Sequence, residues 1–248
     1  MKKIIICLIL CLLACPSFSA NYGSIDRRAK NVPEQYNKSI TELVKYLIQP
    51  YTKDEQKARV LLAWIVYHVD YDAHKEAEYK RRNKKYLNPL KNKYRPDVST
   101  GDIFETRLGV CGDIADLYRR MLGLAGLDSA SVSGIAGYNV KPQDIGDFAH
   151  AWTAVKIDGK WELVDPTWAI GGGSATVMAD DISTRKHARE VEKRQKDFAK
   201  NSDSTRKNRY IRDEWFLPKP RDMIKTHFPN EERWQLLPTP KSIHLFLE

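Results

Sequence analysis

The stretch HAWTAVKIDGKWELVDPTW, residues 150–168, holds two runs of strand-forming residues on either side of Asp158-Gly159. Side chains alternate between apolar and polar along the first run, as they do in a half-buried strand. An Asp-Gly pair between two such runs is the strongest short-range signal for a two-residue hairpin turn. The sequence therefore predicts an antiparallel hairpin in which Ile157 pairs with Lys160.

The register of this hairpin predicts a histidine–carboxylate pair. Counting back from the turn sets His150 opposite Thr167 and Trp152 opposite Asp165. His150 and Asp165 then point to the same face as diagonal neighbours, whose backbones lie about 7–8 Å apart. Because both side chains extend from that face, we expect the carboxylate to accept a hydrogen bond from the imidazole.

A second segment supplies a candidate nucleophile. Cys111 lies in Gly109-Val110-Cys111-Gly112, directly before a run with apolar residues at helical spacing. Gly126 is a plausible end of that helix. The sequence thus predicts a helix that begins at Cys111 and buries one apolar face, which consists of Ile114, Leu117, Tyr118, Met121, Leu122 and Ala125.

Cys111, His150 and Asp165 together have the chemistry of a nucleophilic triad. Unpaired amide groups and the positive end of the helix dipole both favour a thiolate at a helix N-terminus. The imidazole would act as acid and base, and the carboxylate would fix its tautomer. The N–H groups of Cys111 and Gly112 are candidate donors to an oxyanion. We place Gly112, Trp152 and Trp168 in the substrate cleft, and we expect the tryptophans to form core or cleft wall and to take no part in the chemistry.

The first 20 residues have the three parts of a secretory signal. Lys2 and Lys3 precede the apolar run 4–14, and small residues at 17–20 allow cleavage after Ser19 or Ala20. Cleavage would remove three of the four cysteines and leave Cys111 alone, which excludes an internal disulfide. We expect a periplasmic or secreted protein. A lipoprotein carrying its lipid on Cys15 is the less favoured alternative, because proline follows that cysteine.

The net charge of +9 is concentrated in two segments. Residues 75–95 carry nine Lys or Arg against two acidic residues, and residues 185–212 carry eleven against four. Both are predicted as solvated insertions. An alternative is that they bind an anionic cell-envelope surface. Nucleic acid is disfavoured as a partner, because no zinc-finger spacing or RNA-binding signature accompanies the charge.

Further segments predict helices before the cysteine. Residues 39–48 read as a short helix, and Thr52 to Glu55 has the form of a capping box that opens a longer one. His68 on the longer helix is a candidate ligand or base, although a hydrogen-bonded core or surface histidine is the commoner role. No cofactor or metal is expected: Gly171-Gly172-Gly173 lacks the lysine of a phosphate-binding loop.

In their order and spacing these motifs resemble the transglutaminase-like cysteine enzyme superfamily. The resemblance is to its kyphoscoliosis-peptidase-like branch, and it covers roughly residues 55–237. It rests on Gly109–Gly112, Ala149–Trp152, Trp161–Trp168, the helix segment Ala63–Asp72 and the downstream segments Phe216–Leu217, Met223–Pro229 and Trp234–Leu237. It implies a papain-like α+β fold, in which the cysteine helix packs on an antiparallel sheet carrying His150 and Asp165.

The resemblance also implies acyl transfer through a thioester, with Cys111 as nucleophile. Water as acceptor gives a protease or amidase, and an amine gives a transglutaminase. Because no calcium-loop pattern is present, hydrolysis of peptide or protein substrates is the favoured reading. A catalytically silent module that binds peptide or cell wall is the alternative from another class.

The same resemblance guides the predicted division of the chain. We expect a signal peptide (1–20), an N-terminal helical extension (21–54) and a catalytic core (55–178) with a basic insertion (74–97). A second basic insertion (179–212) and a C-terminal family extension (213–248) follow.

Overall fold

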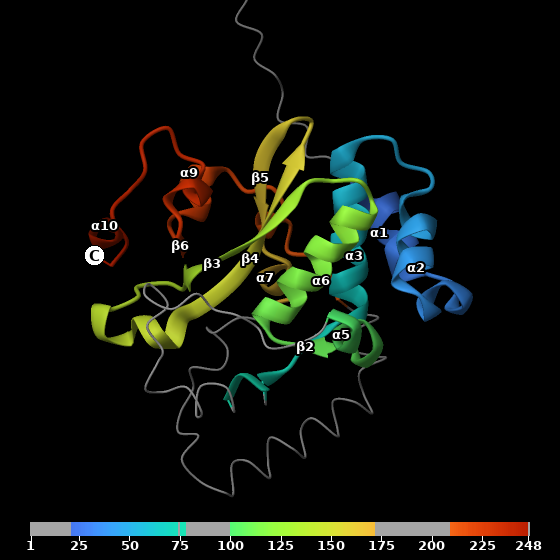
Figure 1. Ribbon diagram of the computed structural model, residues 1–248, viewed down its shortest axis with the longest axis horizontal. Coiled ribbons are helices and arrows are strands. Elements are labelled where there is room, and N and C mark those ends of the chain that lie inside the picture. The colour runs from blue at the N-terminus through green and yellow to red at the C-terminus, as the bar shows by residue number, and fades with distance from the viewer. Residues whose placement is uncertain (1–20, 74, 78–99, 172–208, 248) are drawn as a thin grey trace, which may run out of the picture.

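The computed structural model describes residues 21–73, 75–77, 100–171 and 209–247 (Figure 1). The predicted signal and most of both basic segments lie outside these ranges. Among the described helices, none combines the length and the hydropathy that crossing a bilayer requires.

Helices dominate the first half of the described chain and a small sheet the second. The α-helices are α1 (Gly23–Lys30), α2 (Ile40–Ile48), α3 (Asp54–His68), α5 (Thr100–Thr106), α6 (Cys111–Leu124), α7 (Pro166–Ile170), α9 (Pro220–Met223) and α10 (Ile243–Phe246). The strands are β1 (Asp70–Tyr71), β2 (Leu108–Gly109), β3 (Ser129–Ala136), β4 (Ala149–Ile157), β5 (Lys160–Val164) and β6 (His227–Pro229). The 3-10 helices are η1 (Glu34–Lys38), η2 (Pro142–Phe148), η4 (Asp213–Trp215) and η5 (Glu232–Gln235).

The hairpin forms with the predicted register next to its turn. Ile157 pairs with Lys160, and Asp158 and Gly159 have φ values of 48° and 82°. Positive φ at both turn residues is the type I′ conformation, whose twist matches that of the two strands. The predicted pairing therefore holds where the turn imposes it.

Farther from the turn the predicted pairing is wrong. The ladder between β4 and β5 ends at Thr153 and Val164, so the expected pairs of His150 with Thr167 and of Trp152 with Asp165 do not form. The chain leaves the sheet there because Pro166 has no amide hydrogen to donate to a ladder. Asp165 instead becomes the N-cap of α7.

The main sheet has the strand order β5-β4-β3-β6 and is antiparallel throughout. Its fourth strand comes from the far end of the chain: β6 pairs with β3, with Ile135 opposite Phe228. The C-terminal segment, residues 209–247, also pairs with the opposite edge of the sheet, where Phe216 forms a β-bridge with Val164 of β5. Residues 211–229 thus contact both edges of the sheet.

Two apolar clusters lie on the two faces of this sheet. The larger contains the buried faces of α1, α2, α3 and α6 together with Val155 and Ile157 of β4. The smaller contains Trp152 and Ala154 of the same strand and includes Met223 and Trp234 from the C-terminal segment. Because strand side chains alternate between faces, one strand serves both clusters. The helices cover one face of the sheet and the C-terminal segment the other (Figure 1).

The predicted helices before Cys111 are present as α2 and α3, but the capping box is not. Lys53 takes the N-cap position of α3 and makes no side-chain cap. Glu55 accepts a hydrogen bond from the Tyr22 hydroxyl instead. Tyr22 is the N-cap residue of α1, and its half-buried phenol needs a hydrogen-bond acceptor. The Glu55 carboxylate fills this role and is therefore not part of a capping box.

The fold class is α+β, with the cysteine helix packed on an antiparallel sheet, as the sequence predicts. Helix α6 begins at Cys111 and packs against β4, where the Thr153 hydroxyl donates to Ala115 O at 3.2 Å. This packing fixes the start of α6 near the strand that carries His150.

Candidate active site

Cys111 is the first residue of α6 and a free thiol, with 5 % of its surface exposed. Val110 before it is extended, and the ladder of helical hydrogen bonds starts with Ile114 N–H donating to Val110 O at 3.0 Å. The N–H groups of Cys111 and Gly112 therefore have no acceptor within the helix, as is the case for the first N–H groups of any helix. Their dipoles favour negative charge at this end of α6.

The start of α6 is held by Asp113. Its Oδ2 accepts from the Val110 N–H at 3.0 Å and from Lys75 Nζ at 2.8 Å. The first contact closes the turn around the cysteine, and the second compensates the charge of a carboxylate that is almost fully buried.

His150 connects the cysteine to a carboxylate. Its Nε2 donates to Asp165 Oδ2 at 2.7 Å, and Cys111 lies close enough to the ring to influence its pKa. Burial disfavours the charged ring, but the charge and hydrogen bond of Asp165, with a smaller contribution from Cys111, outweigh burial and raise the pKa of His150 to about 10. The structure thus brings the three predicted triad residues together.

Asp165 is held by four donors. Its Oδ1 caps α7 by accepting from the amides of Thr167 at 2.8 Å and Trp168 at 3.0 Å. Its Oδ2 accepts from two imidazoles, one on His150 and the other on His227. Burial alone would raise the pKa of this carboxyl, but the two histidines hold it well below its ordinary range. Asp165 is therefore an anion at neutral pH although it is fully buried.

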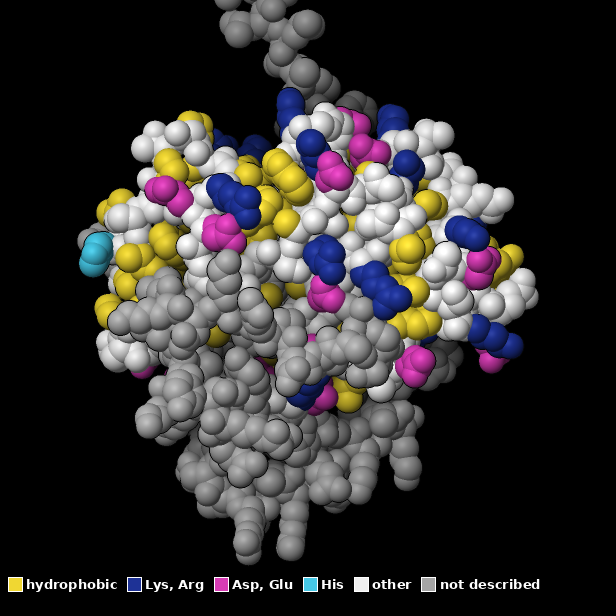
Figure 2. All heavy atoms as spheres, in the orientation of Figure 1, with side chains coloured by type: hydrophobic (Ala, Val, Ile, Leu, Met, Phe, Trp, Pro, Cys, Tyr) yellow, Lys and Arg dark blue, Asp and Glu magenta, His cyan; other side chains and the backbone are white. Residues whose placement is uncertain are grey.

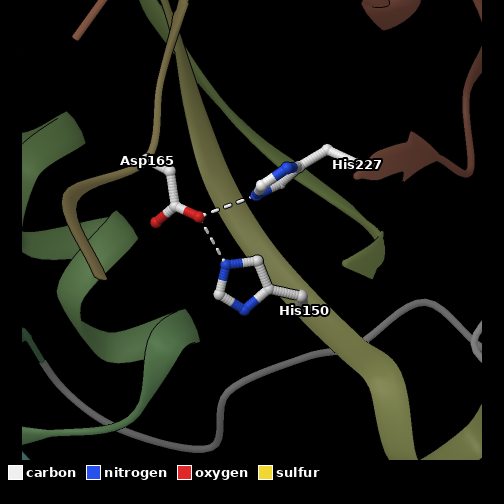
Figure 3. Close-up of side chains that lie close together, drawn as sticks. All are labelled: His150, Asp165 and His227. Carbon is white, nitrogen blue, oxygen red and sulfur yellow. Dashed lines mark hydrogen bonds and ion pairs between the residues drawn. The ribbon is translucent and has the colours of Figure 1, made fainter. Parts of the chain in front are cut away.

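His227 is the functional candidate that the sequence did not reveal. It begins β6 and donates from Nε2 to Asp165 Oδ2 at 2.9 Å, so both imidazoles converge on one oxygen (Figure 3). It stands within the segment Met223–Pro229, which resembles the family's tail. No local pattern links it to Asp165, because the pairing of β6 with β3 brings the two together.

Three tryptophans surround His227. The ring centroids of Trp152, Trp168 and Trp215 lie 5.1, 4.5 and 5.2 Å from that of the histidine. This burial lowers the pKa of His227, and its hydrogen bond to Asp165 offsets the effect only in part. The ring is therefore neutral at pH 7.

The residues assigned to a cleft lie around this site but are largely buried. Trp152 is 1 % exposed and Trp168 is 7 % exposed, while Gly112 is buried in the first turn of α6. Tyr138, which is 60 % exposed, stacks on Trp168 with centroids 5.8 Å apart. Trp168 therefore lies between the solvent-facing Tyr138 and the histidines.

His150, Asp165 and His227 are also the one group of described residues whose ligand atoms are close enough to share a metal ion. Their N-to-O separations of 2.7 and 2.9 Å are hydrogen-bond lengths. Tetrahedral zinc with bonds of about 2.0–2.1 Å would need its ligand atoms farther apart. His68 lies elsewhere, with Nε2 3.0 Å from Ala29 O and its ring stacked on Trp64. That geometry fits a hydrogen-bonded histidine of the helical core.

Comparison with known proteins identifies the family of the chain. Residues 41–166, about half of the chain, match the model of the transglutaminase-like superfamily. The human kyphoscoliosis peptidase is 30 % identical over 84 % of this chain, and hillarin of Drosophila melanogaster is 27 % identical over 91 %. The chain spans about a quarter of the length of these relatives, 26 % and 24 %.

Among solved structures, the periplasmic domain of TgpA from Pseudomonas aeruginosa is 19 % identical with a TM-score of 0.39. That alignment covers 62 % of this chain and 52 % of the other. The family match spans α2 to the start of α7 and includes all three residues of the predicted triad. The chain belongs to the transglutaminase-like superfamily.

Proposed function

We propose that this protein is a cysteine-dependent acyl-transfer enzyme that hydrolyses peptide or amide bonds. The observation that carries the proposal is the 2.7 Å hydrogen bond between His150 and Asp165 beside Cys111, the first residue of helix α6. This is the arrangement in which a thiol nucleophile, a proton carrier and an orienting carboxylate cooperate.

The resting state of the site is an imidazolium next to the thiol. A ring with a pKa near 10 carries its proton at pH 7. Because Nε2 donates to Asp165, Nδ1 is the nitrogen left to face Cys111. An adjacent imidazolium stabilises a thiolate, which is the reactive form of cysteine.

In the acylation step, Cys111 Sγ attacks the substrate carbonyl and forms a carbon–sulfur bond. The amide N–H groups of Cys111 and Gly112 stabilise the oxyanion that develops. His150 donates its proton to the leaving amine as the carbon–nitrogen bond breaks. A water molecule then attacks the thioester, His150 accepts the water's proton, and the acid product leaves with the thiolate restored.

Hydrolysis is favoured over amine transfer because the human relative in the comparison is named a peptidase. That protein is about four times longer than the match, so its substrates are not carried over. For this chain we propose a peptide or protein substrate and export to the periplasm or the medium.

Binding of an anionic cell-envelope surface remains a proposal for the two basic segments. On the face seen in Figure 2, the described Lys and Arg side chains stand among Asp and Glu side chains. The proposal therefore rests on residues 75–95 and 185–212, most of which lie outside the described ranges.

Alkylation by iodoacetamide tests the nucleophile. We expect Cys111 to react rapidly near pH 7. In His150→Ala the rate should fall to about one tenth of the wild-type rate or lower, because the thiolate loses its counterion. His68→Ala is the matched control, since His68 belongs to the helical core. Equal rates in wild type and His150→Ala would contradict the proposal and favour the silent binding module.

A second assay separates hydrolysis from transfer. The protein is incubated with a glutamine-containing peptide and a labelled primary amine, and products are followed by mass spectrometry. We expect Cys111-dependent gain of water, as cleavage or deamidation, with little amine incorporated. Amine incorporation without net hydrolysis would instead establish a transglutaminase. Cys111→Ser controls for contaminating activity.

A further inference from the structure

The fourth strand of the sheet delivers a second imidazole to Asp165. His227 is 1 % exposed, and its Nε2 lies 2.9 Å from the same Oδ2 that accepts from His150. Strand β6 is fixed by its pairing with β3, where Gly134 stands opposite Pro229, and by Asn230 N–H donating to Ser133 O at 2.8 Å. The position of this histidine is therefore set by the backbone of the sheet.

The contacts of His227 define its tautomer. Asp165 Oδ2 is a carboxylate oxygen that can only accept, so Nε2 of the ring carries a proton. Burial lowers the pKa of His227, so the neutral ring has no proton on Nδ1. The Thr226 hydroxyl lies 2.8 Å from Nδ1 and also donates to Met223 O at 3.3 Å. The ring is thus a neutral donor that is committed to the carboxylate.

Aromatic rings form most of the surroundings of this donor. Trp152, Trp168 and Trp215 enclose the His227 ring with their aromatic faces and edges. The charged and titratable groups that face it are Asp165 and His150. A buried carboxylate oxygen that loses one of its donors must turn toward another donor or admit water. Either response would move Oδ2 away from its alignment with His150.

We propose that His227 is a positioning residue of the active site, supplied by the C-terminal segment, which fixes Asp165 Oδ2 against His150. The inference rests on the proposed function. It also extends the site beyond the family match, which ends at residue 166: His227 is the one side-chain donor to Asp165 that lies outside that match. His227 itself is not placed in contact with substrate.

The test compares His227→Leu with His227→Gln. Leucine removes the donor, whereas the glutamine amide reaches about as far as imidazole Nε2 and can still donate to Asp165. Iodoacetamide alkylation of Cys111 near pH 7 should slow about tenfold in His227→Leu and stay within about twofold of wild type in His227→Gln. A tenfold change corresponds to about 1.4 kcal/mol, just below the range of about 1.5–3 kcal/mol for a hydrogen bond to a charged group.

A second readout is independent of the thiol. The proton on His150 Nε2, held against Asp165 at 2.7 Å, gives a downfield proton NMR signal. We expect this signal in wild type and His227→Gln, and its loss or broadening in His227→Leu. Circular dichroism melting reports whether each variant folds. If His227→Leu does not fold, Thr226→Val is used in its place. This variant keeps the His227 ring, removes the hydroxyl at Nδ1, and should slow alkylation by less than the tenfold expected for His227→Leu.

The outcomes separate the two proposals. Wild-type rates and an intact signal in folded His227→Leu would overturn the positioning role, as would a glutamine variant as impaired as the leucine variant. If wild-type Cys111 alkylates no faster than His150→Ala, the proposed function fails. Loss of the signal in His227→Leu alone would then still support the position assigned to His227.

Discussion

Lys75 Nζ lies 2.8 Å from Asp113 Oδ2, so a side chain from the segment after β1 neutralises a carboxylate in the first turn of the cysteine helix. The Asp113 side chain is 1 % exposed and that of Lys75 is 37 % exposed. Without the lysine, a buried negative charge would remain two residues from Cys111 and oppose formation of a thiolate there.

Replacement of this lysine should reduce the reactivity of the thiol. We expect Lys75→Met to slow alkylation of Cys111 two- to fivefold, since a partly exposed ion pair contributes about 0.5–1 kcal/mol. The rate is measured near pH 7 with iodoacetamide. Lys225→Met breaks an exposed pair with Asp222 and is the control, which should match wild type. A faster reaction in Lys75→Met would exclude this electrostatic role.

The His150–Asp165 pair predicts a pH-dependent stability. The folded pKa of His150 is about 10, above its ordinary value near 6.5, so its contribution is complete below about pH 6.5 and is lost as the pH rises toward 10. The pKa of Asp165 is lowered, so its contribution is present above about pH 4 and is lost in acid. The pair thus contributes most between about pH 4 and 6.5.

Urea unfolding of wild type and His150→Gln at pH 5, 7 and 9 checks this sign. The difference in free energy of unfolding should be largest at pH 5 and smallest at pH 9. His227, whose pKa is lowered, has the opposite dependence, but it is present in both proteins and its contribution largely cancels. A difference that grows with pH would show that His150 is neutral in the folded protein.

Arg59 is expected to dominate the stability of the helical core. Its side chain is 2 % exposed and pairs with Asp26 of α1 at 2.7 Å and with Asp213 of η4 at 2.6 Å. Arg59→Ala should lower the free energy of unfolding by about 3 kcal/mol, because it removes a buried side chain and leaves the carboxylate of Asp26, which is 18 % exposed, without its partner. Asp213→Asn should cost less than about 1 kcal/mol, since that carboxylate is 69 % exposed. Equal losses would mean that the interaction with Asp26 is not the main one.

Gly134 is predicted to control the position of His227 from the neighbouring strand. A Cβ at this position would lie 2.1 Å from Phe228 O and 2.8 Å from Pro229 Cα. Gly134→Ala should therefore displace β6 and slow Cys111 alkylation as His227→Leu does. Gly123→Ala in α6 meets nothing within 4 Å and should stabilise the protein by up to about 1 kcal/mol. Unchanged alkylation in a folded Gly134→Ala would show that β6 adapts without moving the histidine.

The parts of the site that the sequence predicts are those set by local periodicity. The turn at Asp158-Gly159 and the helix that starts at Cys111 each follow from a few neighbouring residues. The approach of His150 to Asp165 is also predicted, although the ladder ends at Thr153 and Val164, before either of the counted pairs. Proline ends the ladder, and the N-cap position then turns the carboxylate toward the histidine.

His227 and the missing capping box are two features that local sequence patterns do not predict correctly. His227 is brought to Asp165 by strand pairing across most of the domain, which no nearby residue encodes. Glu55 fits a capping box in sequence, yet in the fold a phenol from α1 competes for its carboxylate. Both departures arise because a buried polar group takes whichever partner the tertiary structure brings within reach.

The points where the two basic segments join the fold are closed by backbone hydrogen bonds. Asp72 precedes the segment 75–95 and Gly109 follows it, and the Asp72 N–H donates to Gly109 O at 2.9 Å. Ala169 precedes the segment 185–212, and the N–H of its last residue, Arg212, donates to Ala169 O at 3.3 Å. When the ends of an insertion are already bonded to each other, lengthening it costs little, since the loop-closure term grows only logarithmically. The length and charge of either segment can therefore change without moving the start of α6 or the hydrogen-bonded pair of His150 and Asp165.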